Sequence, residues 1–139
     1  MTTELINRSE PQTDQQDELM KVAKKLELTI QAQYSELDLL SNSLSQIQEG
    51  THIYAETYNE YRNAGITFRA SIVFAFGILE QHKSPRDKQL YNEWKNKLGN
   101  QPFKNLNEAK DFRDTTTKLL FNMQEYTDSI LDELEIGGI

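Results

Sequence analysis

Between Leu19 and Ile47 the apolar residues recur with a regular period over four heptads. Nine positions are spaced alternately four and three residues apart, and neither proline nor glycine interrupts them. Eight of the nine are apolar, and Gln33 is the polar one: Leu19, Ala23, Leu26, Ile30, Gln33, Leu37, Leu40, Leu44 and Ile47. This spacing is typical of a long helix that packs against another helix through a narrow apolar seam. We therefore expect one helix over about residues 17–48, with a seam that has to be covered.

A second copy of the chain, or another protein, is one way to cover this seam. Apolar residues make up 37% of the 139 residues, which is below the share of an average globular domain and favours narrow seams over one thick core. We expect Leu26, Ile30 and Leu37 to contact the partner, and a homo-oligomer is the simplest form of that contact. Gln33 either fixes the register of the pairing or extends from the edge of the seam into solvent.

Gly50 and Thr51 separate this helix from a second one, which we expect from His52 to His82. It ends in an apolar run from Ala70 to Leu79. A helix that is apolar on every side is buried on every side, so we expect this run at the centre of the fold. Gly65 leaves two alternatives open, a continuous helix or a break.

Two further helices follow. Ser84 and Pro85 are typical of a helix start, and the short helix that they open should end at Leu98, before Gly99. Asn105 should begin the last helix, which runs to about residue 135. Its apolar stripe is made of Phe112, Leu119, Met123, Tyr126, Ile130 and Leu134.

Three long helices and one shorter helix, joined by short loops, predict an all-α antiparallel helical bundle with coiled-coil-like seams. Residues 1–15 lack an apolar period and contain Pro11, so we expect a disordered leader there. A single helical-bundle domain should span residues 16–136, and residues 137–139 should be a frayed C-terminus.

The sequence offers little that catalysis or metal binding could use. It has no cysteine, which excludes disulfides, thiolate metal sites and cysteine nucleophiles. Glu49 and His52 have the spacing of one half of a di-iron carboxylate motif, but Leu79 stands where the second half would need a glutamate before His82. No phosphate loop or catalytic signature occurs. We expect no enzyme activity, no metal, no cofactor and no small-molecule substrate.

Acidic residues gather at the C-terminal end. Residues 120–139 hold five acidic side chains and no basic one, and Glu125, Asp128 and Asp132 line one face of the last helix. Like charges at this spacing, and acid at a helix C-terminus, both destabilise an isolated helix. We expect this face to meet a positive surface, on a partner or on the chain's own central segment, or else to stay solvated. The basic residues considered in the central segment are Arg62, Arg69, Lys83 and Arg86.

Basic and aromatic residues mix in the central part of the chain. The segment 57–119 holds eleven basic and seven acidic side chains. Tyr54, Tyr58 and Tyr61 share one helix face, and Arg62 follows them. Such a mixture fits a protein-binding hot spot, a surface for single-stranded nucleic acid, or a bundle core. A net charge of −7 for the whole chain disfavours nucleic acid, because phosphate contacts supply most non-specific affinity.

These observations favour a non-enzymatic interaction module, such as an adaptor, an assembly factor or a small structural subunit. The alternative is a small helical accessory protein or mobile-element regulator that binds nucleic acid through segment 57–119. The N-terminus lacks the basic and apolar regions of a signal peptide, and the longest apolar run is far shorter than the roughly 20 residues that cross a bilayer. We therefore expect a cytoplasmic protein without membrane contact.

Overall fold

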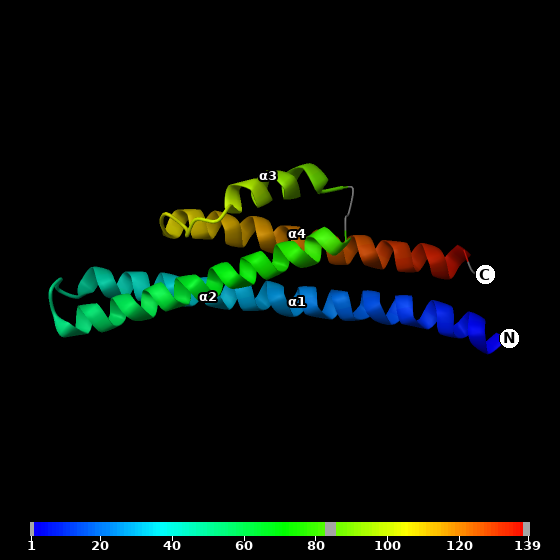
Figure 1. The fold of residues 1–139 in the computed structure, drawn as a ribbon, viewed down its shortest axis with the longest axis horizontal. Coiled ribbons are helices and arrows are strands. Elements are labelled where there is room, and N and C mark those ends of the chain that lie inside the picture. Colours follow the sequence, from blue (N-terminus) through cyan, green and yellow to red (C-terminus); the bar gives the residue numbers. More distant parts are fainter. Residues whose placement is uncertain (1, 83–85, 138–139) are drawn as a thin grey trace.

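The computed structural model describes residues 2–82 and 86–137, and the side chains of residues 17–82 and 86–127. The described chain forms four helices: α1 (Thr2–Gln46), α2 (His52–His82), α3 (Lys88–Leu98) and α4 (Leu106–Gly137). Each helix runs antiparallel to the one before it, as Figure 1 shows, so the predicted all-α antiparallel bundle is confirmed. We predicted a frayed C-terminus at residues 137–139. Residue 137 is the last residue of α4, and residues 138–139 lie outside the described residues.

The first helix extends further toward the N-terminus than the periodicity predicts. Its backbone is helical from Thr2 onward, through the segment 1–15 in which we expected a disordered leader, and Met1 lies outside the described residues. A helix that is already nucleated by its packed portion adds residues without a new nucleation cost. Apolar periodicity cannot reveal such an extension, because the added turns need no buried stripe.

Side-chain caps set two of the helix starts where the sequence predicts them. The hydroxyl oxygen of Thr51 accepts a hydrogen bond from the backbone N–H of Tyr54 at 3.2 Å, and Gly50 before it takes a φ of 86°. The side-chain oxygen of Asn105 accepts one from the N–H of Glu108 at 2.9 Å. Both contacts satisfy N–H groups that have no partner inside the helix.

Two further expectations concern the start of α3 and the continuity of α2 at Gly65. The helix α3 begins after Asp87, whose side chain makes no capping hydrogen bond, and the expected start at Ser84 and Pro85 lies outside the described residues. The helix α2 is continuous through Gly65, where an added Cβ would meet only a methyl group of Leu37 at 3.9 Å. The glycine therefore neither breaks α2 nor is required by close packing.

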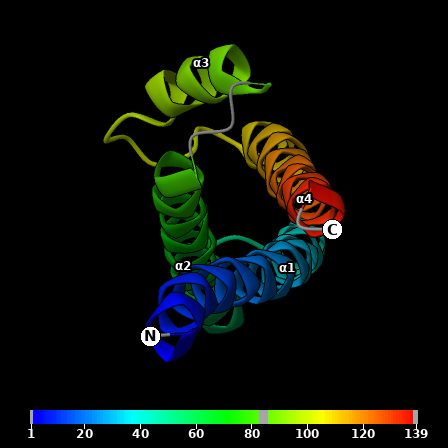
Figure 2. The same cartoon turned by 90° about the vertical axis from the view of Figure 1, so that its right-hand side faces the viewer.

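The helix α1 packs against both α2 and α4, and α3 lies across the opposite side of these two helices (Figure 2). One core joins all four helices. Its buried side chains are Ala23, Leu26, Ile30, Tyr34 and Leu37 from α1, Phe68, Ile72, Ala75, Phe76 and Ile78 from α2, Leu98 from α3, and Ala109, Phe112, Leu119, Leu120 and Met123 from α4. The seam of α1 is thus covered by the chain's own α2 and α4.

Aromatic rings tie the short helix to the bundle. The ring of Trp94 meets the ring of Phe112 edge-on, with centroids 4.9 Å apart, and Phe103 lies 5.1 Å from the same Phe112 ring. Phe103 also lies 5.6 Å from Phe68 on α2. Tilted ring pairs of this kind contribute about 0.5–1.5 kcal/mol each beyond the area that they bury. Phe68 and Phe112 are therefore core residues of the basic and aromatic segment, and Trp94 and Phe103 are partly buried and pack against that core.

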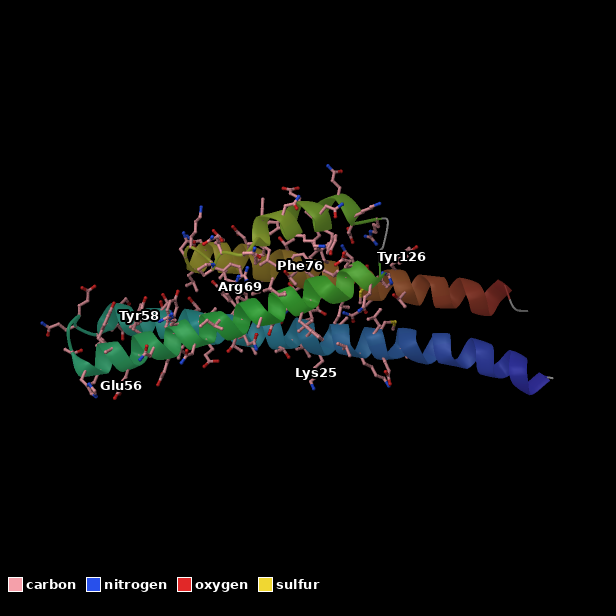
Figure 3. All side chains as sticks on the ribbon, viewed as in Figure 1. Lys25, Glu56, Tyr58, Arg69, Phe76 and Tyr126 are labelled. Carbon is pink, nitrogen blue, oxygen red and sulfur yellow. The ribbon has the colours of Figure 1, made fainter. Side chains whose placement is uncertain are left out.

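Arg69 fastens the loop between α3 and α4 to α2 (Figure 3). Its guanidinium donates hydrogen bonds to three backbone carbonyl oxygens, at 3.2 Å to Leu98, 2.7 Å to Gly99 and 3.0 Å to Gln101. The C-terminal carbonyls of a helix have no intrahelical partner, and a cation there also complements the helix dipole. This contact places the loop beside the middle of α2.

Candidate interaction surface

The α1 residues that we expected to bind a partner lie inside the fold. Leu26, Ile30 and Leu37 are core side chains with exposed fractions of 8%, 0% and 3%. A partner could reach them only if α2 or α4 moved away. Gln33 is half-buried beside α2, and its side-chain oxygen is buried without a hydrogen-bond partner among the described residues. We therefore do not place the candidate surface on this seam.

The expectation that the apolar run of α2 is buried on every side is wrong for one side. Phe68, Ile72 and Phe76 are buried, but Val73 and Phe74 are 46% and 58% exposed. The helices α1, α3 and α4 all contact α2 from its inner side, and Figure 2 shows α2 at the edge of the bundle. A bundle of this size cannot surround every helix, and α2 keeps an apolar side in solvent.

Five residues make up this exposed side, which we call the outer face of α2: Ile66, Ala70, Val73, Phe74 and Gly77. Their spacing places them on one side of the helix over three turns. Ile66 is 60% exposed, and a Cβ added to Gly77 would meet nothing within 4 Å. The outer face is therefore apolar and accessible, and it has open space for another backbone at Gly77.

Charged residues stand at the two ends of the outer face. Arg62 is exposed one turn before Ile66, and Glu80 is exposed almost one turn after Gly77. A carboxylate oxygen of Glu80 lies 3.2 Å from the side-chain nitrogen of Lys95 on α3. The outer face is thus bordered by a positive charge at its N-terminal end and a carboxylate at its C-terminal end.

A groove of about 460 Å³ continues the outer face at its N-terminal end, between α2 and the segment that leads into α4. Tyr58, Arg62 and Ile66 line it from α2, and Lys104 lines it from the opposite wall. Together with Arg69, three basic side chains and no acidic one among the described residues line the groove. Because the guanidinium of Arg69 is bound to backbone carbonyls, the charges available to a ligand are those of Arg62 and Lys104.

The tyrosines of the predicted aromatic face divide between core and surface. The rings of Tyr54 and Tyr58 stack with centroids 6.5 Å apart, and Tyr58 is half exposed. Tyr61 is half-buried and packs against the core. The structure therefore brings Tyr58, Tyr61 and Arg62 together at the groove, and Tyr61 packs against the core as well.

The acidic residues of α4 lie elsewhere. Glu125 is exposed, and the side chains of Asp128 and Asp132 lie outside the described residues. His82, at the end of α2, contacts Thr127 in this part of α4. Arg62 and Arg69 lie thirteen or more residues earlier on α2. Within the described part of the chain, these two arginines therefore do not neutralise the acidic face.

His52 and His82 lie at opposite ends of α2, and His52 contacts Glu56 one turn away at 3.0 Å. In the described residues, no three side chains of the metal-binding types gather into a site. Nor does any helix there have the length and apolarity to cross a membrane. Comparisons of the chain with protein-family models, curated proteins and solved structures found no match.

Proposed function

We propose that this protein is a non-enzymatic interaction module that binds another protein helix along the outer face of α2. The supporting observation is the exposure of Val73 and Phe74 in the middle of the most apolar stretch of the chain. Each Å² of apolar surface left in water forgoes about 25 cal/mol. A partner that covers the outer face recovers this free energy, and none of the helices in the described part of the chain covers that side.

The dimensions of the outer face suit a helical partner. Ile66 to Gly77 covers about 16 Å along the helix, at 1.5 Å per residue. Its residues recur at steps of three and four, the pattern by which an amphipathic helix contacts a complementary surface. The small side chain of Ala70 and the absence of one at Gly77 allow the closest approach.

The nucleic-acid alternative has less support from the side-chain positions. A single-strand binder needs exposed rings beside basic residues. Trp94 and Phe103 instead pack in or against the core, and the guanidinium of Arg69 is bound to the loop. Tyr58 and Arg62 remain at the groove, so a test of the function should be able to detect nucleic acid as well.

Site-specific photo-crosslinking in cells that produce the protein tests this proposal. A photoreactive phenylalanine analogue replaces Phe74 in one variant and Leu28 in the control. The exposed fraction of Leu28, 60%, is close to the 58% of Phe74, but Leu28 lies on α1, outside the outer face. We expect a discrete protein adduct from position 74 and none from position 28. Equal labelling at the two positions would contradict a docking role for α2, and an adduct that nuclease removes would support the alternative.

A further inference from the structure

We infer that the helix bound by the outer face is α2 of a second copy, with the two α2 helices antiparallel about a two-fold axis near residues 71–72. This inference rests on the proposed function, because it uses the same surface. It adds the identity of the partner and the register of the pairing.

The sizes of the side chains are self-complementary in this register. An axis between residues 71 and 72 sets Ile66 opposite Gly77 of the second copy, and Ala70 opposite Val73. Each pairing joins a small residue to a larger one, so the two backbones can approach to the 8–10 Å typical of packed helices. In a parallel pair, Gly77 would face Gly77 and leave a gap, and Phe74 would face Phe74.

The charges at the ends of the outer face fit the same register. Arg62 and Glu80 are eighteen residues apart, about five full helical turns, so they lie on the same flank of α2. Their midpoint is residue 71, close to the centre of the apolar residues. A two-fold axis there brings Arg62 of each copy to Glu80 of the other. A parallel pair would instead set like charges against each other.

The existing contacts of these two residues permit the pairing. Arg62 is exposed. One carboxylate oxygen of Glu80 lies 3.2 Å from the side-chain nitrogen of Lys95, and the Glu80 side chain is about half exposed. The Glu80 carboxylate can therefore accept one hydrogen bond from Lys95 of its own copy and another from the Arg62 guanidinium of the second copy. Because a single helix pair makes a small interface, we expect a concentration-dependent monomer–dimer equilibrium.

Disulfide crosslinking of single-cysteine variants tests the register of the two α2 helices directly, because the chain has no cysteine of its own. In the antiparallel pair, two copies of A70C are offset by about 4.5 Å along the helix, and two copies of I66C by about 16 Å. Disulfides form only when the Cα atoms are closer than about 7 Å. We expect A70C to crosslink to itself, and I66C to crosslink only when mixed with G77C. L28C serves as the exposed control.

Charge reversal supplies the independent check, by sedimentation equilibrium over a range of protein concentrations. R62E and E80R should each raise the dimer dissociation constant several-fold, and the double variant should restore it. Both residues are exposed, so circular dichroism should show an unchanged helix content. Recovery in the double variant distinguishes a direct pair from a general effect of charge.

The possible outcomes separate this inference from the proposed function. A monomer at every concentration, or an I66C variant that crosslinks to itself, overturns the antiparallel dimer. If the photoreactive residue at position 74 then still gives a protein adduct, the module binds a different protein and only the second-copy partner is lost. If position 74 gives no adduct either, both proposals fail.

Discussion

The Nε2 atom of His82 lies 2.6 Å from the hydroxyl oxygen of Thr127, and this contact joins the end of α2 to α4. The Thr127 hydroxyl donates its proton to the carbonyl oxygen of Met123 at 2.9 Å, so Nε2 of the imidazole is the donor in the first contact. The other ring nitrogen, Nδ1, is buried without a hydrogen-bond partner among the described residues. Protonating it would place a charge and an unpaired N–H inside the bundle.

The free energy of unfolding should therefore decrease as the pH falls and the imidazole of His82 binds a second proton. Burial lowers the pKa of His82 below its ordinary value of 6.5, so the unfolded state binds the proton first as the pH falls. We expect the free energy of unfolding to be highest above about pH 6.5 and to decrease below it, until the pH reaches the folded-state pKa. His82→Gln keeps a donor near Thr127 and removes the titration. Urea unfolding from pH 7.5 to 5.5 should show a weaker pH dependence in this variant, and an equal dependence would contradict the assignment.

Two buried threonines of α4 should respond in opposite ways to the same substitution. The hydroxyl of Thr116 is buried without a hydrogen-bond partner among the described residues, whereas that of Thr127 bonds both His82 and Met123. Valine keeps the shape and removes the hydroxyl. We expect Thr116→Val to raise the free energy of unfolding by about 1 kcal/mol and Thr127→Val to lower it by about 1–3 kcal/mol. Thermal unfolding of the two variants side by side measures this, and a loss of stability in both would show that the Thr116 hydroxyl has a partner.

Removing the guanidinium of Arg69 should loosen the loop between α3 and α4. Arg69→Met keeps most of the apolar stem but leaves the carbonyl oxygens of Leu98, Gly99 and Gln101 without their donor. We expect a loss of about 2 kcal/mol in the free energy of unfolding, because hydrogen bonds from a charged donor are among the stronger ones. Hydrogen exchange of residues 98–105 should also become faster. Arg62→Met, on the exposed side of the same helix, is the control and should leave both measurements unchanged in dilute protein.

The α1 seam should contribute to the stability of the monomer. Ile30 is fully buried between α2 and α4, whereas Leu28 is 60% exposed on the same helix. Ile30→Ala should lower the free energy of unfolding by about 2–5 kcal/mol, and Leu28→Ala should change it by less than about 0.5 kcal/mol. The measurement is chemical unfolding at two protein concentrations. If the cost of Ile30→Ala appeared only at the higher concentration, the seam would be an intermolecular contact after all.

Local signals in the sequence were sufficient for the helices and some of their ends. The span of α2 from His52 to His82 was predicted, and so were the caps at Thr51 and Asn105. Such features depend on residues within one or two turns. The start of α1 at Thr2 was missed because the sequence before Leu19 has no regular apolar period.

The interaction surface was harder to predict, because exposure depends on which helices meet. Ile30 belongs to a narrow apolar seam and Phe74 to the most apolar run of the chain, and the sequence assigned the first to a partner and the second to the core. The structure instead buries Ile30 on α1, which packs against the chain's own α2 and α4, and leaves Phe74 exposed, with none of the described helices over it. Periodicity reports that an apolar side needs a neighbour, and says nothing about whether that neighbour belongs to the same chain.

The two glycines inside α2 allow folding and association to be measured separately. An added Cβ meets nothing within 4 Å at Gly77, and only a methyl group of Leu37 at 3.9 Å at Gly65. Alanine is favoured over glycine within a helix by about 1 kcal/mol, so Gly77→Ala and Gly65→Ala should both raise the free energy of unfolding in dilute protein. Only Gly77→Ala adds a group to the outer face, where Ile66 of a second copy would approach. We therefore expect Gly77→Ala to weaken dimerisation in sedimentation equilibrium while Gly65→Ala leaves it unchanged, and equal dimerisation of the two variants would exclude close packing at Gly77.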